Sequence, residues 1–241
     1  MTVCEIKDQK VEIAGVTIES EPESLVDGLV IQNQTNFEFL PEKISHTFPK
    51  LRVIEIIGCS LKLISGNHFK GLEELEYLDL RGNGIESIES GAFKDQKNLY
   101  QLHLGVNNIQ VLRPEIFKGL EGLKEVWLRE NGIEFLLKET FELLTSVERI
   151  SLGRNKLTFI PENLFENNVN LIEIWLHGNR INSISPNMFD DLTKLEYLDF
   201  QGNSCWSSYY NSDELTKMKN DIKAHCSYPQ VKENILKSFL Y

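Results

Sequence analysis

An asparagine recurs every 24 residues through the middle of this chain, each time at the end of the same apolar frame, L-x-x-L-x-L-x-x-N. Self-similarity at a fixed period is the sequence signature of a solenoid, in which each repeat folds into one coil and stacks on its neighbours. The period constrains the fold more than any other feature, because every coil must follow the same path. The recurring residues are Asn83, Asn107, Asn131, Asn155, Asn179 and Asn203.

The frame also predicts the path of each coil. Its three apolar positions point inward from a short strand, and the asparagine side chain satisfies backbone groups where the strand turns away. A phenylalanine ten residues later, as at Phe93, Phe117 and Phe141, fills the back of the coil. An earlier copy begins at Leu51 and carries Cys59 at the asparagine position, which the leucine-rich repeat pattern permits. We predict an α/β fold: a right-handed leucine-rich repeat solenoid of about eight coils of about 24 residues, with a parallel β-sheet on its concave face.

Both ends of the repeat array differ from the repeat itself. VCEIKDQKVEIAGVTIES alternates apolar and polar residues, which predicts a β-hairpin that covers the first apolar layer. At the other end, DELTKMKNDIKAHC places Leu215, Met218 and Ile222 on one helical face. We therefore expect a hairpin cap over residues 1–25, repeats over 26–203, a C-terminal helical cap over 204–228 and an amphipathic tail over 229–241.

Four cysteines bear on the caps. Cys205 follows Asn203 by two residues and Cys226 closes the predicted cap helix, an arrangement that commonly locks the terminal cap of extracellular repeat proteins. We predict a Cys205–Cys226 disulfide, the alternative being two buried, reduced thiols. Cys59, at a ladder position, is typical of a buried reduced thiol, whereas the even number of cysteines leaves a Cys4–Cys59 bridge open.

With its repeat frame and both caps, the chain resembles the extracellular leucine-rich repeat proteins, and most closely the insect (dipteran) innate-immune members. CEIKDQKVEIAGVTI, LVIQNQTNFEFLP and the two-cysteine GNSCWSS cap carry this resemblance, which covers about residues 4–226. It implies a secreted, non-catalytic protein that recognises proteins or microbial ligands and often pairs through a carboxyl-terminal helix. The chain departs from the pattern in having only Cys4 in its hairpin and no long heptad region.

Charge and hydropathy narrow the classes of partner. With 25 basic against 36 acidic residues, the formal net charge of −11 repels nucleic acid and anionic membranes. No apolar run approaches the roughly 18 residues that a membrane-spanning helix needs. We therefore expect no nucleic-acid partner and no membrane span.

The outward side chains of the predicted strands give the candidate binding surface. Because alternate residues of a strand point to opposite faces, Trp127, Ser151 and Trp175 lie in one outward row on three successive strands. At ~4.8 Å between strands the two tryptophans should stand ~10 Å apart and form a slot over Ser151. Exposed tryptophan and arginine carry a disproportionate share of interface energy, so we interpret this row as a binding site.

Basic and further aromatic residues extend this site. Arg129, Arg149, Arg154 and His177 should surround the slot, and Tyr77, His103 and Tyr197 lengthen the surface toward both ends. A surface of this length suits a protein better than a small molecule. The alternative is that the sheet face tolerates tryptophan and that the arginines pair with glutamates. Those glutamates are Glu125, Glu130, Glu148 and Glu173.

Catalysis and metal binding are weakly supported. Asp79 and His103 should lie on adjacent strands with Glu125 nearby, but no nucleophile motif or phosphate loop accompanies them and an open face does not exclude water. The spacing of these three residues is not that of a zinc site. We predict neither an enzyme nor a bound metal or cofactor.

The sequence therefore predicts a secreted recognition module of innate immunity that binds a protein through its concave face. Two alternatives stay open: recognition of a glycan or lipid, and adhesion or homo- or heterodimerisation through the tail. Asn33-Gln34-Thr35 is an N-glycosylation sequon, so a glycan on Asn33 would accompany secretion.

Overall fold

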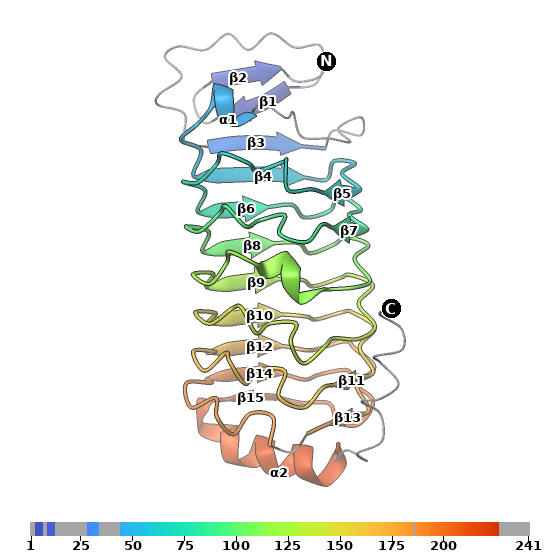
Figure 1. The fold of residues 1–241 in the computed structure, drawn as a ribbon. Helices are drawn as coiled ribbons and strands as arrows, with labels where there is room; N and C mark the ends of the chain where they lie inside the picture. The colour runs from blue at the N-terminus through green and yellow to red at the C-terminus, as the bar shows by residue number, and fades with distance from the viewer. Residues whose placement is uncertain (1–2, 7–8, 13–27, 34–43, 186, 227–241) are drawn as a thin grey trace.

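A computed structural model describes residues 3–6, 9–12, 28–33, 44–185 and 187–226. In these residues the coils stack along one axis, and a long β-sheet runs down one side of the stack (Figure 1). Seven parallel pairings join the eight central strands of this sheet, which confirms the predicted leucine-rich repeat solenoid. These strands are β3 (Gly28–Gln32), β4 (Val53–Ile57), β6 (Tyr77–Asp79), β8 (Gln101–His103), β9 (Glu125–Trp127), β10 (Arg149–Ser151), β12 (Glu173–Trp175) and β14 (Tyr197–Asp199).

Antiparallel strands close the sheet at both ends. At the amino end, β1 (Val3–Ile6) and β2 (Gln9–Glu12) form the predicted hairpin, and β1 pairs antiparallel with β3. At the carboxyl end, β15 (Tyr209–Asn211) pairs antiparallel with β14. The parallel ladder is therefore flanked by a strand of opposite direction on each side, and the edge of the repeat array is covered.

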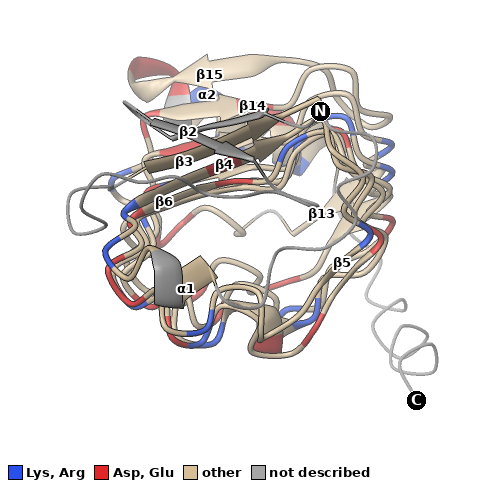
Figure 2. Ribbon diagram, turned by 90° about the horizontal axis from the view of Figure 1, so that it is seen from above, with Lys and Arg blue, Asp and Glu red and all other residues tan. Residues whose placement is uncertain are grey.

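The rest of each coil consists mainly of turns. Short parallel pairs lie on one side wall: β5 (Leu63–Ile64) with β7 (Ser87–Ile88), and β11 (Phe159–Ile160) with β13 (Ser183–Ile184). Among the described residues, the helical segments are α1 (Ile44–Thr47), η2 (Pro114–Phe117), η3 (Ser212–Glu214) and α2 (Leu215–His225). Figure 2 shows basic and acidic residues interspersed around the coils when the stack is seen from above.

The recurring asparagines tie each coil to the next, as Asn107 shows. Its Nδ2 donates to the carbonyl of Leu104 at 2.9 Å and to that of Leu80, one coil earlier, at 3.0 Å. Its Oδ1 accepts from the backbone N–H groups of Asn83 and Ile85, each at 3.0 Å. One buried amide therefore satisfies four backbone groups that the turn would leave without partners.

We expect Asn107→Ala to lower the free energy of unfolding by about 3 kcal/mol, because each buried polar group left without a partner costs about 1–3 kcal/mol. Asn108→Ala is the matched control, since this neighbouring side chain is exposed; its effect should stay within about 0.5 kcal/mol. Urea unfolding of both variants measures the difference, and equal losses would contradict the role given to Asn107.

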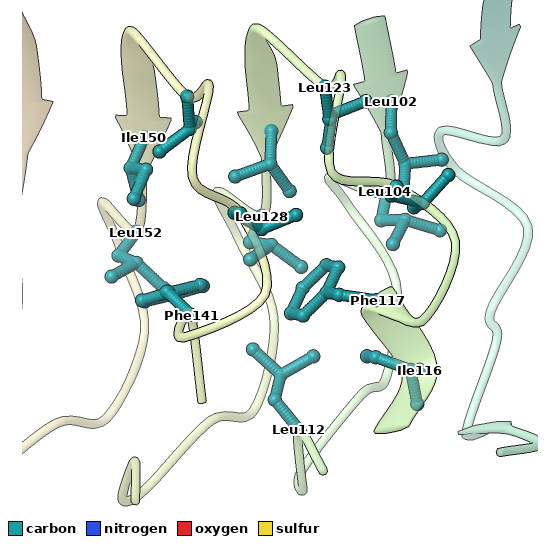
Figure 3. Packing of buried hydrophobic residues seen from close by; sticks show 14 of the residues in the cluster. Leu102, Leu104, Leu112, Ile116, Phe117, Leu123, Leu128, Phe141, Ile150 and Leu152 are labelled. Carbon is teal, nitrogen blue, oxygen red and sulfur yellow. The ribbon is translucent and has the colours of Figure 1, made fainter. Parts of the chain in front are cut away.

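Phenylalanines form a second column, behind the sheet. Phe117 and Phe141 of successive coils lie among the inward leucines of the strands (Figure 3), with ring centroids 5.8 Å apart. The Phe141–Phe165 and Phe165–Phe189 pairs follow at 6.1 and 6.4 Å. All four side chains are buried, so the prediction that this residue fills the back of the coil is confirmed.

The carboxyl-terminal cap combines a disulfide with a polar network. Cys205 and Cys226 are bonded, as predicted. The indole Nε1 of Trp206 donates to the hydroxyl of Tyr210 at 2.6 Å, and that hydroxyl donates to Asp221 Oδ2 at 3.0 Å. Burial raises the pKa of Tyr210 to about 12, with the Asp221 hydrogen bond adding to the effect, so the donor proton is retained.

Helix α2 covers the last apolar layer. Met218 and Ile222 are buried on the face that the sequence predicted to be apolar. The carbonyl of Cys226 accepts a hydrogen bond of 2.9 Å from the backbone N–H of Ile184 in β13. The cap is therefore attached to the side wall by its backbone as well as to the last turn by its disulfide.

Removal of the disulfide should weaken this cap. We expect Cys205→Ser with Cys226→Ser to cost about 2–4 kcal/mol of unfolding free energy. Urea titrations of the intact protein and the double variant, each with and without reductant, measure this loss. An unchanged transition midpoint would contradict a stabilising role, and a further reductant-dependent shift in the variant would indicate a Cys4–Cys59 bridge.

Several sequence predictions fall outside the described residues. The tail at 229–241 and the side chain of Cys4 are among them, so the tail helix, the Cys4–Cys59 bridge and the domain boundaries stay predictions. Cys59 itself is buried at its ladder position, where its backbone N–H donates to Asn83 Oδ1 at 3.1 Å.

Candidate binding surface

The register of the parallel strands fixes the rows of the concave sheet face, by which we mean the face that points away from the core. Trp127, Ser151 and Trp175 are direct partners on β9, β10 and β12. His103 on β8 precedes them in the same row. The residue before each of them in its strand points inward and is buried: Leu102, Val126, Ile150 and Ile174. The outward row predicted from the repeat is therefore confirmed.

Aromatic rings run without interruption across this face, and we call these six residues the aromatic strip. Its members contact one another in sequence order, with centroid separations of 5.2, 5.6, 5.1, 5.9 and 6.5 Å. They are partly or well exposed side chains on an otherwise open sheet. The strip consists of Tyr77, His103, Trp127, Trp175, Tyr197 and Tyr209.

The prediction of a slot between the two tryptophans was wrong. The centroids of Trp127 and Trp175 lie 5.1 Å apart with an angle of 33° between the ring planes, although one strand separates them. Ser151, only 2% exposed, is too small to keep the rings apart. Both indoles lean over it, because ring contact removes apolar surface from water and stacked aromatics attract each other.

Glutamates neutralise the centre of the predicted basic spot, at Arg149. Arg149 lies between two carboxylates, with Nη1 at 3.1 Å from Glu125 Oε1 and Nε at 3.1 Å from Glu173 Oε1. The hydrogen bond to Glu173 is the main cause of the raised pKa of Arg149. Glu125 also accepts a 3.1 Å hydrogen bond from Trp127 Nε1. The alternative interpretation, arginines paired with glutamates, is therefore confirmed here, and the network also fixes the orientation of the central indole.

The remaining predicted residues lie at the carboxyl ends of the strands. Arg129 and Arg154 both bind Glu130 Oε1, at 2.6 and 3.3 Å. His177 Nδ1 lies 3.1 Å from Asp199 Oδ2, and its ring covers Gly153 so closely that a Cβ there would approach it to 2.5 Å. Gly153 is thus required for the flat placement of the imidazole on the backbone.

The geometry around Asp79 does not match a catalytic dyad. Its fully buried carboxylate is held by Arg81, through Nε at 2.8 Å and Nη2 at 2.7 Å, so it does not orient His103. His103 Nε2 is buried without a hydrogen-bond partner in the described structure. Burial, followed by the charge of Asp79, raises the pKa of Tyr77 to about 12. Within the described ranges no group of three potential ligands could hold a metal ion.

Sequence analysis missed Tyr209 and the role of Glu125. Tyr209 follows the last repeat, and only its antiparallel pairing with Asp199 places it beside Tyr197. The two adjacent tyrosines of the SSYYN stretch after the last ladder asparagine could have indicated a strand there, because aromatic residues favour strands. Glu125 was considered as a partner of arginine and as a neighbour of His103, whereas it also binds the indole of Trp127.

A groove of about 750 Å³ lies on the side wall near β7. Its lining includes Ile88, Val111, Arg113, Ile116 and Phe135. Val111 is 43% exposed. This groove gives a rival surface against which the aromatic strip can be tested.

The chain belongs to the leucine-rich repeat family: the family model matches residues 49–105, 97–157 and 145–204, which together cover more than half of the chain. Among solved structures it is similar to TLR13 in a complex with ssRNA13 (TM-score 0.70, 28% identity over 73% of this chain). It is also similar to Drosophila Toll in the Toll–Spatzle complex (TM-score 0.69, 22% identity over 77%).

The chain spans only 25% and 26% of the length of these two proteins. A search of the curated proteins gives no match. Across the described residues, no helix combines the length and apolar character required to cross a membrane.

The burial of His103 under the neighbouring rings leads to a testable prediction for the pKa of its imidazole. Burial lowers the pKa of His103 from its ordinary value of 6.5, and the nearby Asp79 charge partly opposes this effect. We expect NMR titration to give a pKa below 6.5 and Trp127→Ala to raise it, because loss of the stacked indole readmits water. Phe135→Ala, on the side wall, is the control.

The sign of the stability effect follows from the lowered pKa. The unfolded chain binds a proton at His103 more readily, so unfolding free energy falls as the pH drops below 6.5 toward the folded pKa. His103→Gln should remove this part of the pH dependence. A folded pKa at or above 6.5 would contradict the buried, neutral imidazole.

Proposed function

We propose that this chain is a secreted, non-catalytic recognition module of innate immunity that binds a protein partner through its concave sheet face. The aromatic strip is the observation that carries the proposal. An unbroken row of six rings on an open sheet presents apolar surface that water solvates poorly, and such surfaces mark binding sites. Tryptophan and tyrosine are also the residues most enriched in interface hot spots.

The length of the strip favours a macromolecular partner. It extends over the strands from β6 to β15, and six adjacent strand-to-strand steps of ~4.8 Å give about 29 Å. This length exceeds what a small ligand covers and matches the scale of a protein interface. The network of Arg149 with Glu125 and Glu173 runs alongside the strip and supplies charged groups for specificity.

Ring orientation favours a protein over a glycan. The planes of His103 and Trp127 are 12° apart, and those of Trp127 and Trp175 are 33° apart. The central rings therefore cover one another's faces and present mainly their edges, whereas a sugar ring needs an open aromatic face to stack on. The edges carry partial positive charge. Trp175 Nε1 adds a donor without a partner among the described residues, so the strip suits carbonyl and carboxylate acceptors.

The proposal that the protein is secreted and acts in innate immunity rests on the disulfide and on the similar structures. A disulfide persists in oxidising compartments, which supports secretion. The two similar structures are complexes of TLR13 with RNA and of Toll with Spatzle, the latter a hub in development and innate immunity. Affiliation with the insect immune proteins, supported by the cap sequences, and N-glycosylation of the exposed Asn33 belong to the same proposal.

Loss of the central rings should remove most of the partner binding and leave the fold intact. We expect Trp127→Ala with Trp175→Ala to weaken binding at least about tenfold, because tryptophan dominates interface hot spots. The fold should survive, because both side chains lie outside the core. The experiment captures proteins from the extracellular fluid of the source organism on the intact chain and on the double variant, identifies them by mass spectrometry and measures their affinities. Circular dichroism and urea unfolding confirm that the variant is folded.

Two further variants separate the rival surfaces. Val111→Ala with Phe135→Ala removes comparable apolar surface from the side-wall groove, and a chain ending at residue 228 removes the tail. Binding that survives the tryptophan changes and is lost in the groove variant would refute the concave-face proposal. Dependence on the tail alone would favour adhesion or dimerisation through residues 229–241.

A further inference from the structure

The turn that follows each concave strand contains one residue in the left-handed region of backbone space. This position recurs in every coil from β3 onward, with φ between 54° and 70°. Side chains with a Cβ are disfavoured in this region, and glycine or asparagine normally occupies it. The eight residues in this column are Asn33, Gly58, Gly82, Val106, Glu130, Arg154, Gly178 and Gly202.

Hydrogen bonds between coils impose this conformation whatever the side chain. The backbone N–H of Gly82 donates to the carbonyl of Gly105 at 3.1 Å, and that of Gly178 donates to Gln201 at 2.7 Å. In the same way, Val106 donates to Arg129 at 2.8 Å. The ladder therefore demands a positive φ at each turn, and any side chain placed there is strained.

Three consecutive coils carry a strained side chain where the others carry glycine or asparagine. Valine is the least suited of the three, because its branched Cβ is the most disfavoured in this region. Space does not explain the glycines at positions 82 and 202, where a Cβ would meet nothing closer than 3.5 Å. At Gly58 and Gly178 a Cβ would meet the side chains of Asn33 and Arg154, at 2.8 and 3.1 Å. Strain of this kind persists where the side chain has a use, and sites of binding are where it concentrates.

The three side chains adjoin the aromatic strip. Val106 follows the strand of His103 by three residues, Glu130 follows Trp127 by three, and Arg154 follows Ser151 by three. Val106 is 52% exposed, and its contribution to the core is correspondingly small. None of the three therefore occupies its position because of packing inside the coil.

We define the rim patch as Arg81, Val106, Arg129, Glu130 and Arg154. Its one carboxylate is less exposed than its three guanidinium groups: the Glu130 side chain is 33% exposed, and those of Arg81, Arg129 and Arg154 are 49%, 47% and 60% exposed. Arg81 binds a fully buried Asp79 and presents only its own side chain to water. The patch is thus locally basic, with an apolar centre, in a chain whose net charge is −11.

We propose that the rim patch binds an acidic segment of the protein partner, a segment that also places an apolar side chain on Val106. This inference rests on the proposed function and extends its footprint from the aromatic strip to the carboxyl ends of β8, β9 and β10. Charge complementarity selects the segment, since exposed arginines attract carboxylates and repel basic sequences. The positive edges of the aromatic rings favour the same acceptors.

The test begins with a phage library of random twelve-residue peptides selected on the intact protein, and a glycan array probed in parallel. We expect the recovered peptides to be rich in Asp and Glu beside an apolar residue and to bind more weakly as salt increases. Their affinities are then measured on Val106→Gly/Glu130→Gly/Arg154→Gly, on Arg154→Gln and on Lys118→Gln. Lys118→Gln is the charge-matched control, because Lys118 is exposed beside η2 and outside the patch.

The glycine variant should lose affinity at least about tenfold while its unfolding midpoint stays equal or rises, because the strain is relieved. Arg154→Gln should weaken binding and Lys118→Gln should not. Gly82→Val, which adds strain at the same position, should lower the midpoint. A lower midpoint in the glycine variant, peptides without acidic residues, or binding of glycans alone would each overturn the inference.

The same peptides separate this inference from the proposed function. Peptides that lose affinity on Trp127→Ala/Trp175→Ala but bind the glycine variant normally would leave the aromatic strip as the binding surface and refute the rim patch. Peptides that bind both variants normally would refute both proposals.

Discussion

The amide side chain of the ladder asparagine is the interaction on which the rest of the structure depends. A coil turns sharply at the end of its concave strand, and the turn removes several backbone groups from both water and the ladder. At Asn107 one side chain satisfies groups in its own coil and in the preceding one. Because these bonds join residues of neighbouring coils at a fixed separation, the 24-residue period gives one register from β4 to β14, and the pairing of β3 with β4 spans 25 residues.

The fixed register separates the two faces of the sheet. Inward residues such as Val126 and Ile150 are fully buried, and the outward residues between them are released from any role in the core. Aromatic side chains from different repeats, 24 residues apart in sequence, are thereby brought into contact along the stack. Trp127 and Trp175, 48 residues apart in sequence, still touch, because the coil between them contributes only Ser151.

The repeat made the backbone predictable but left the side-chain contacts undetermined. The strands and the buried phenylalanines follow from position within the period. The capping helix and the Cys205–Cys226 bond follow from the helical pattern and the cysteine spacing after the last ladder asparagine. The closure of the slot does not, because the period sets the distance between strands and not the rotamers above them. The pairing of Arg149 was only one of two open interpretations, since charge alone does not decide between a partner in the chain and one in solution. Tyr209 lay beyond the period altogether.

The column of positive φ angles has a wider consequence. In most proteins the cost of a side chain in a given backbone conformation is judged against other proteins, whose surroundings differ. Here eight turns of one molecule present the same conformation to glycine, asparagine, valine, glutamate and arginine, and in seven of them the backbone N–H donates to a carbonyl of the next coil. A solenoid of this kind thus contains its own reference series. A residue type that is less favourable than glycine in this conformation, and that recurs in adjacent coils, can therefore be recognised from a single chain.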